Sequence, residues 1–259
     1  MLDESTFDFI SLANRLADAS GPIIRNYFRT PFKVDQKGDG SPVTLADKEA
    51  ETIIRSILAG ERPMDGIFGE EYKTRNLDAE FIWVIDPIDG TKSFITGRPI
   101  FGTLIALVQK NEPILGLIDQ PINKERWLSA RGEGATFNGE VIRVRACPTL
   151  TDAVIGTTSP ELFNTTGQTH WRDVAARAKH VIYGGDCYTY AQLATGFVDV
   201  VMESGLKPYD FCAIAVLVEE AGGVITDWHG NPVTLNSDGS ILACGDPRVH
   251  REIMDFIRK

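Results

Sequence analysis

Apolar residues recur at helical spacing over two stretches of the first sixty positions. Residues 5–28 are expected to form an amphipathic helix, because one face collects Phe9, Leu12, Leu16, Ile23, Ile24 and Tyr27. A second helix is expected to begin near Thr44 and to bury Ala50, Ile53, Ile54, Ile57 and Leu58. The segment between them contains Gly38, Gly40 and Pro42, which predict a loop.

The middle of the chain has the patterns of β-strands. Residues 81–85 (FIWVI) are continuously apolar and predict a strand that is buried on both faces. The apolar runs 101–108 and 114–119, separated by a turn at 109–113, predict a β-hairpin. A further hairpin is expected around Asn138-Gly139, since both residue types tolerate a positive φ.

From about residue 150 the pattern changes to alternating strands and helices. Helices are expected to end near Gly196 and to span 211–221, and strands are expected at 153–157, 180–183, 198–202, 224–227 and 241–243. This order predicts two layered halves that share one interface. We place the boundary near 140–150, which gives an N-terminal α+β half (1–145) and a C-terminal α/β half (146–259).

Composition narrows the class of protein. The chain has 259 residues, 43% of them hydrophobic and 24% charged, which is typical of a globular protein. No apolar run reaches the roughly 18 residues of a membrane span, and the acidic start lacks the pattern of a signal peptide, so a cytoplasmic protein without membrane association is expected. Four scattered cysteines and four histidines at no metal-binding spacing predict reduced thiols and no zinc centre.

The net charge of −10, with no run of lysine or arginine, disfavours nucleic-acid binding. It also creates a requirement for any anionic substrate. A strongly negative protein accepts a phosphate group only where something reverses the local field, and bound divalent cations do so.

The segment 83–94 (WVIDPIDGTKSF) has the strongest chemical signal. Pro87 and Gly90 predict that the strand ends here and that the chain turns, which would aim Asp86 and Asp89 at one point with the Ile88 carbonyl between them. Clustered carboxylate and carbonyl oxygens are the ligands that Mg²⁺ prefers. The structural alternative is that both aspartates bond the amides of their own turn.

Three further acidic segments each have a structural explanation of their own. Glu70 and Glu71 follow a short apolar run, and one of them is expected to face inward while water solvates the other. Asp210 suits the N-cap of an apolar helix. Thr44 and Asp47 match a capping box.

The joint occurrence of these segments, in this order, resembles the inositol monophosphatase family of metal-dependent phosphatases. The matching segments are VTLAD (43–47), GEE (69–71), WVIDPIDGTKSF (83–94) and KPYDFCAIAVLVEEAGG (207–223). The resemblance implies a layered αβαβα sandwich, a phosphomonoesterase activity, two or three Mg²⁺ ions in each active site, and a homodimer.

The resemblance also implies roles for individual residues. Gly90 and Thr91 match residues whose backbone amides hold the phosphate. Asp47 and Thr91, together with Glu70, match the residues that orient or activate the attacking water. The metal ligands implied are Glu70, Asp86, the Ile88 carbonyl, Asp89 and Asp210.

Two segments resemble the histidinol-phosphate phosphatase branch of the family, namely TGRPIFGTLIAL (96–107) and GGDCYTYAQLATG (184–196). Tyr209 stands where many members have tryptophan. The amine of histidinol phosphate would give Asp186 and Glu203 a charge-assisted partner, which the neutral hydroxyls of inositol do not require. Asp186 also suits the cap of a helix beginning near Tyr188, a reading that is compatible with the first.

The roles of Lys92 and Arg98 stay open between the phosphate, the pocket rim and solvated surface charge. Two functional alternatives also stay open beside histidinol-phosphate hydrolysis. One is an inositol-1-phosphate or broader small-metabolite phosphatase. The other is a non-catalytic regulatory protein on the same fold.

Overall fold

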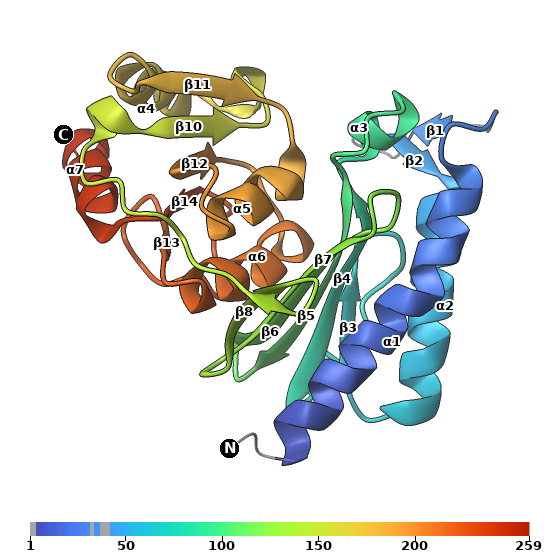
Figure 1. The fold of residues 1–259 in the computed structure, drawn as a ribbon. Helices are drawn as coiled ribbons and strands as arrows, with labels where there is room; N and C mark the ends of the chain where they lie inside the picture. The colour runs from blue at the N-terminus through green and yellow to red at the C-terminus, as the bar shows by residue number, and fades with distance from the viewer. Residues whose placement is uncertain (1–3, 32–33, 37–41, 259) are drawn as a thin grey trace.

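The structure is a computed structural model that describes residues 4–31, 34–36 and 42–258. Its elements form five layers, three helical and two of β-sheet (Figure 1). The predicted αβαβα sandwich is therefore confirmed. Gly38 and Gly40 of the predicted loop lie outside the described residues, and Pro42 begins the short strand β2 (Pro42–Thr44), which pairs with β1 (Val34–Gln36).

Helices α1 (Glu4–Tyr27) and α2 (Leu45–Glu61) form the first layer and cover one face of the larger sheet. Their apolar faces follow the predicted pattern. Leu16 and Leu58 are fully buried in one cluster with Trp83 and Ile105 of the sheet. The two helices thereby fix the sheet edge that carries the acidic segments.

The second layer is a seven-stranded sheet in which neighbours in sequence are neighbours in space. Only the first pair is parallel, and every other pair is antiparallel. Both predicted hairpins are present, with positive φ at Lys110 and Asn111 in one turn and at Asn138 and Gly139 in the other. The strands are β3 (Gly66–Gly69), β4 (Phe81–Asp89), β5 (Gly102–Gln109), β6 (Glu112–Gln120), β7 (Glu125–Ala130), β8 (Gly134–Phe137) and β9 (Glu140–Val141).

The fourth layer is a five-stranded sheet with the order β11-β10-β12-β14-β13. The pairs of β10 with β11 and β12 are parallel, and those of β14 with β12 and β13 are antiparallel. The strands are β10 (Val154–Thr157), β11 (His180–Tyr183), β12 (Val200–Glu203), β13 (Val224–Asp227) and β14 (Ile241–Cys244). Short 3₁₀ turns at Leu150–Asp152 and Pro160–Leu162 flank β10.

Helices α5 (Asp186–Ala194) and α6 (Pro208–Glu220) lie between the two sheets (Figure 1). Every residue of α6 from Phe211 to Val218 is buried, as expected for a helix that is covered on all sides. At Gly116 of β6 the helix approaches so closely that a Cβ atom would lie 2.1 Å from the Ala213 carbonyl oxygen.

Helices α4 (Thr165–Ala175) and α7 (Pro247–Ile257) cover the outer face of the smaller sheet. All four cysteines are buried and free. Within the described part of the chain, no helix combines the length and apolar character needed to cross a membrane.

Candidate active site

The segment Asp86–Asp89 stays in the sheet instead of turning away. Strand β4 continues to Asp89, so the predicted end of the strand is wrong. Asp86 pairs with Leu104 and Asp89 with Gly102, which leaves Pro87 and Ile88 opposite Thr103 alone. This is a β-bulge, and the extra residue turns the second acid toward the first.

A side chain of the neighbouring strand stabilises the bulge. The Thr103 hydroxyl, fully buried, donates to the Pro87 carbonyl at 2.8 Å, so the irregular backbone keeps a partner. The Ile88 amide donates to an Asp86 carboxylate oxygen at 3.0 Å. The alternative in which an acid bonds its own turn is therefore also realised for Asp86, alongside its place in the acidic cluster.

Three aspartates that are distant in sequence converge at the bulge. Carboxylate oxygens of Asp86, Asp89 and Asp210 all lie within 4.8 Å of one another. Glu70 follows β3, where its amide donates to the Ile85 carbonyl at 3.1 Å, and its side chain shares a hydrogen bond with Asp86. The four acids predicted as metal ligands therefore lie together, as does the intervening Ile88 backbone.

These carboxylates destabilise one another's charged forms. Burial raises the pKa of Asp86 well above its usual range, and repulsion from Glu70 and Asp89 adds to the shift. Burial likewise raises the pKa of Asp89, followed by repulsion from Asp186. Burial raises the pKa of Asp210 to about 7, although a hydrogen bond from the Lys207 amide opposes the shift.

The donor set fits a hard divalent cation. It consists of carboxylate oxygens and one backbone carbonyl, the ligands typical of Mg²⁺. Without positive charge the cluster retains protons, whereas cations would compensate the repulsion and keep all of the acids ionised. With a net charge of −10, the protein needs a local positive field to accept a phosphate group, and cations bound at this cluster would supply it.

Asp210 occupies the third position of α6 and is not its N-cap. Lys207 is the N-cap and Pro208 begins the helix, because proline suits the first helical turn. The Lys207 amide donates to Asp210 at 2.6 Å, which leaves the other carboxylate oxygen available to the cluster. The predicted N-cap is thus wrong by three positions, while the structural role at the start of the helix is real.

Asp47 forms the predicted capping box. One carboxylate oxygen accepts from the Thr44 amide at 2.8 Å and from the Thr44 hydroxyl at 2.6 Å, and the residue is fully buried. Neighbouring Ala46 shares an apolar cluster with Ile88 and Phe94. The first turn of α2 therefore lies beside the segment that carries Thr91.

Gly90 links β4 to the short helix α3 (Thr91–Ile95). Its φ is +85°, and a Cβ atom here would lie 2.6 Å from an Asp186 carboxylate oxygen. The Thr91 hydroxyl donates to the Ile88 carbonyl at 3.2 Å. Only glycine combines this backbone conformation with so close an approach of the C-terminal half.

Asp186 does not cap a helix, which corrects the structural alternative. Gly185 is the N-cap of α5, without a side-chain cap bond, and Asp186 is the first helical residue with a φ of +45°. Its carboxylate accepts from the Ser93 hydroxyl at 3.0 Å. Burial raises the pKa of Asp186, although Ser93 and the charges of Arg98 and Lys92 oppose the shift. Lys92 and Arg98 are therefore solvent-exposed, and their positive charges also favour the ionised form of Asp186.

Glu203 lies at the end of β12 and is buried. Its carboxylate accepts from the Thr158 amide at 2.6 Å and from the Thr157 hydroxyl at 3.3 Å. Burial raises the pKa of Glu203 to about 7. A cavity of about 70 Å³ connects it to the acidic cluster, with a lining of Asp89, Thr158, Leu162, Asp186, Cys187, Tyr190, Glu203, Leu206 and Asp210.

Two positioning residues were missed from the sequence. Ser93 bonds Asp186 across 93 positions of chain. Glu51, fully buried on α2, accepts from the Glu71 amide at 2.8 Å and pairs with Arg55 at 2.6 Å, which fixes the loop that presents Glu70. Ser93 lies inside the recognised motif, and Glu51 is an acid on the expected buried face of a helix, which was the available signal.

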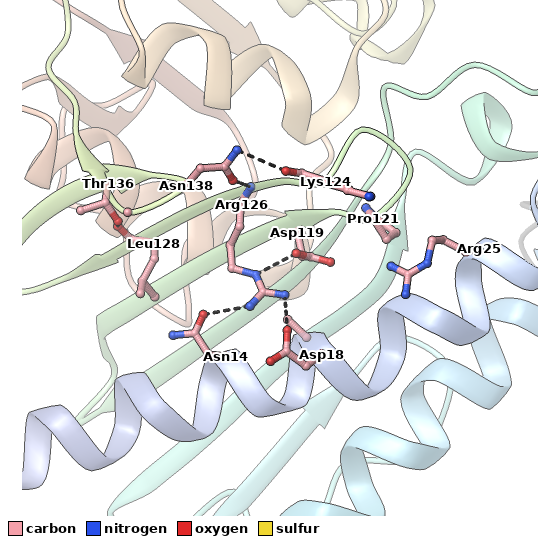
Figure 2. Close-up of a pocket in the computed structure, with 12 residues that line it drawn as sticks. Asn14, Asp18, Arg25, Asp119, Pro121, Lys124, Arg126, Leu128, Thr136 and Asn138 are labelled. Carbon is pink, nitrogen blue, oxygen red and sulfur yellow. Dashed lines mark hydrogen bonds and ion pairs between the residues drawn. The ribbon is translucent and has the colours of Figure 1, made fainter.

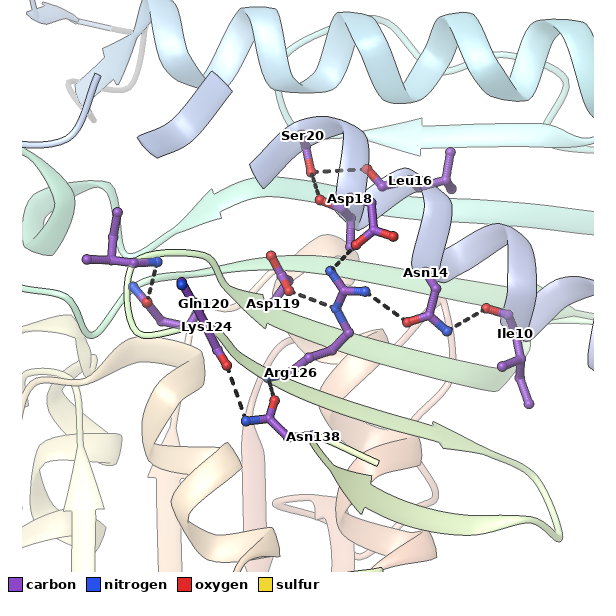
Figure 3. Close-up of polar contacts among 12 residues, drawn as sticks. Ile10, Asn14, Leu16, Asp18, Ser20, Asp119, Gln120, Lys124, Arg126 and Asn138 are labelled. Carbon is purple, nitrogen blue, oxygen red and sulfur yellow. Dashed lines mark hydrogen bonds and ion pairs between the residues drawn. The ribbon is translucent and has the colours of Figure 1, made fainter. Parts of the chain in front are cut away.

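A second cavity, of about 530 Å³, lies between α1 and strands β6 to β8 (Figure 2). Its central cation, Arg126, is already satisfied, as Figure 3 shows. It donates to Asp119 at 2.8 Å, Asn14 at 3.0 Å and Asp18 at 2.8 Å. These bonds hold α1 against the sheet. The two acids of this cavity that contact Arg126 are thereby paired with a cation, unlike the acids at β4.

The model of the inositol monophosphatase family matches residues 7–258. The chain belongs to this family. It is 49% identical to the bifunctional chloroplastic phosphatase IMPL2 of Arabidopsis thaliana over 96% of this chain and 75% of that protein. It is 35% identical to a histidinol-phosphatase of Chlorobaculum parvum, covering 90% of this chain and 91% of that one.

The protein superposes with a TM-score of 0.91 on a solved structure of an inositol monophosphatase from Zymomonas mobilis. The two chains are 47% identical, and the match covers 99% of this chain and 100% of that one. The family consists of phosphatases that use metal ions, generally Mg²⁺, and the cluster at β4 suits such ions. The comparisons include both histidinol-phosphate and inositol-phosphate enzymes and so leave the substrate open.

Proposed function

We propose that the protein is a Mg²⁺-dependent phosphomonoesterase that hydrolyses L-histidinol phosphate to L-histidinol and phosphate, a step of histidine biosynthesis. The observation that carries the proposal is a pair of acids, half-buried Asp186 and buried Glu203, in one small cavity with Asp89 and Asp210. The acidic cluster at β4 supports phosphate hydrolysis in general, whereas the additional acids favour a substrate with a positive charge.

In this proposal two or three Mg²⁺ ions are held by Glu70, Asp86, the Ile88 carbonyl, Asp89 and Asp210. When bound, the ions supply positive charge for the phosphate and lower the pKa of the attacking water. The protein contributes fixed positions for the acids. The bulge, the Lys207 amide on Asp210 and the Cys187 amide on Asp89, at 2.6 Å, set these positions before a substrate binds.

The start of α3 would receive the phosphate. Gly90 and Thr91 begin this helix, and their backbone amides would bond the phosphate oxygens. The Thr91 hydroxyl, Asp47 and Glu70 would orient the attacking water and take up its proton. Phosphoryl transfer depends on positioning and on charge stabilisation, so a nucleophilic side chain is not required.

Histidinol phosphate carries its amine two carbons from the ester oxygen, and the imidazole ring lies beyond it. The short distance suits a cavity that borders the acidic cluster directly. An ammonium group would give the carboxylates of Asp186 and Glu203 a charge-assisted hydrogen bond each. Inositol presents only neutral hydroxyls. They form no charge-assisted hydrogen bond, so they would compensate less of the free-energy cost of shielding two acids from water.

Inositol-1-phosphate is the second candidate substrate. The high structural similarity to an inositol monophosphatase and the similarity to IMPL2, a phosphatase named as bifunctional, favour a protein that accepts more than one phosphate ester. A homodimer, implied by the family resemblance, is part of the proposal and is tested by sedimentation of the purified protein.

A substrate comparison tests the proposal. Phosphate release is measured from L-histidinol phosphate, inositol-1-phosphate and p-nitrophenyl phosphate, with Mg²⁺ and with a chelator. We expect Mg²⁺-dependent hydrolysis with a kcat/KM for histidinol phosphate at least about tenfold above that for inositol-1-phosphate, the value of one charge-assisted bond. A reversed preference rejects the histidinol assignment. The absence of release from every ester supports a non-catalytic protein instead.

A further inference from the structure

The hydroxyl of Tyr190 is a buried polar group that the proposed mechanism does not use. The residue is 2% exposed and lies on α5, where it lines the small cavity of about 70 Å³. Among residues 4–31, 34–36 and 42–258, the hydroxyl oxygen has no hydrogen-bond partner. Asp186 precedes it by four positions on the same helix, so both side chains emerge on one face.

A buried hydroxyl without a partner destabilises a fold, and native proteins rarely contain one. Phenylalanine would fill the same space without this cost. The hydroxyl must therefore bond a group that enters the cavity. The cavity, of about 70 Å³, is large enough to admit an ammonium or hydroxyl group.

The surroundings of the hydroxyl are acidic. Glu203, Asp89 and Asp210 all act electrostatically on Tyr190, and burial together with these acids raises the pKa of the phenol well above its usual range. The phenol therefore stays neutral and offers an acceptor oxygen among carboxylates. A primary ammonium has three N–H donors, and three acceptors line this cavity, Asp186 and Tyr190 from α5 and Glu203 from β12.

We propose that Tyr190 is a specificity-determining residue whose hydroxyl oxygen accepts a hydrogen bond from the primary ammonium group of the substrate. The other two protons of that ammonium are bonded by Asp186 and Glu203. This inference rests on the proposed function and deepens it, because it names the subsite for the amine.

The test compares Tyr190→Phe with the unchanged protein on two substrates that differ only in the amine. These are L-histidinol phosphate and its deaminated analogue, 3-(imidazol-4-yl)propyl phosphate. We expect the ratio of the two kcat/KM values to fall about tenfold in the variant. The change should appear as a higher KM for histidinol phosphate with an unchanged kcat, because the ammonium is bound before and during the reaction and does not itself react.

Tyr183→Phe is the matched control, because Tyr183 lies on β11 with 57% of its surface exposed. It should leave the ratio unchanged. The metal-free Tyr190→Phe variant should unfold at the same or a higher temperature, since it loses an unpartnered hydroxyl, and this measurement excludes misfolding as a cause.

The outcomes separate the two proposals. If the unchanged protein prefers histidinol phosphate over the analogue but Tyr190→Phe keeps this preference, the role of Tyr190 is rejected and the proposed function stands. A fall in kcat alone, equal for both substrates, also rejects it. If the unchanged protein shows no preference for the amine, both proposals are rejected.

Discussion

Two acids of the candidate site have a structural contact that is independent of any metal. Asp47 caps α2 through Thr44, and Asp210 accepts from the Lys207 amide at the start of α6. Each contact uses one carboxylate oxygen of the residue. The structural and chemical interpretations that compete in the sequence are thus compatible at the same side chain, because a carboxylate has two oxygens.

Asp186→Asn tests the substrate subsite at the level of one residue. The amide keeps the size of the side chain but removes its charge, so the charge-assisted bond to an ammonium is lost. We expect the ratio of kcat/KM for histidinol phosphate to that for p-nitrophenyl phosphate to fall by about tenfold or more. Asp173→Asn, the same exchange at an exposed position of α4, should not alter this ratio. An unchanged ratio in Asp186→Asn would remove the residue from the subsite.

Gly90→Ala tests how closely the two halves approach at the phosphate segment. The added Cβ atom would lie 2.6 Å from an Asp186 carboxylate oxygen, in addition to the strain of a φ of +85°. Gly132→Ala is the matched control, since its φ is +81° and nothing lies within 4 Å of the added atom.

We expect the control to lower the free energy of unfolding by about 1 kcal/mol through backbone strain alone. Gly90→Ala should lose about 2 to 3 kcal/mol and should also lower phosphatase activity. Denaturant unfolding with phosphate release measures both. Equal losses of stability in the two variants would show that the Asp186 side chain can move away from the added Cβ atom without a loss of free energy.

At the scale of elements, the sequence predicted most strands and helices and missed the feature that forms the site. The apolar pattern predicts α1, α2, β5, β6, the strands β10 to β14 and the helices α5 and α6, because burial on one face leaves a periodic pattern, whereas α4 is not predicted. The β4 bulge was read as the end of a strand, since Pro87 and Gly90 are strand breakers. Its stability depends on Thr103 of another strand, a contact that no local pattern contains.

Helix α7 was not predicted although its signal is present. Asp246 caps it, Pro247 occupies its first turn, and Val249, Ile253 and Ile257 are buried at helical spacing. The long-range contacts of the site have no such signal in the sequence. The hydrogen bond between Ser93 and Asp186 joins segments 93 positions apart, and only the packing of the layers brings them together.

Gly116→Ala tests the packing of α6 on the larger sheet. The added Cβ atom would lie 2.1 Å from the Ala213 carbonyl oxygen, so helix and strand must separate. We expect the free energy of unfolding to fall by about 3 kcal/mol and Mg²⁺ binding to weaken, because α6 carries Asp210. Gly60→Ala, which meets nothing within 4 Å on α2, should instead stabilise by about 0.5 kcal/mol. Equal effects, measured by denaturant unfolding, would contradict the close packing.

At the scale of the whole molecule, the site joins both predicted halves of the chain. Glu70, Asp86 and Asp89 come from 1–145, whereas Asp186, Glu203 and Asp210 come from 146–259. The larger sheet ends at residue 141 and the smaller sheet begins at residue 154. The division at 145/146 and a cytoplasmic location stay predictions.

Two acids of the site, half-buried Asp210 and buried Glu203, make stability depend on pH in a defined direction. Asp210 and Glu203 have pKa values of about 7, above their ordinary values of 3.8 and 4.5. The folded metal-free protein therefore binds more protons than the unfolded chain between these limits, and the resulting stabilisation is lost as the pH rises through 7. Added Mg²⁺ binds the ionised form and should oppose this loss.

Melting curves at pH 6 and pH 8 measure the effect. Without metal we expect Tm to be lower by about 5 °C or more at pH 8, and Mg²⁺ should raise Tm more at pH 8 than at pH 6. In Asp210→Asn, which removes one titrating group, the fall should shrink. A metal-free Tm that rises from pH 6 to pH 8 would contradict the raised pKa values of these two acids.

The central claim is that acids from distant segments converge at the β4 bulge to bind Mg²⁺. Calorimetric titration of the metal-free protein with Mg²⁺ tests it most directly, with Asp89→Asn as the variant and Asp78→Asn, an exposed aspartate, as the control. We predict saturable binding in the unchanged protein and the control, and affinity at least about 100-fold weaker in Asp89→Asn. Equal Mg²⁺ affinity in all three proteins, or no binding to the unchanged protein, would contradict the account.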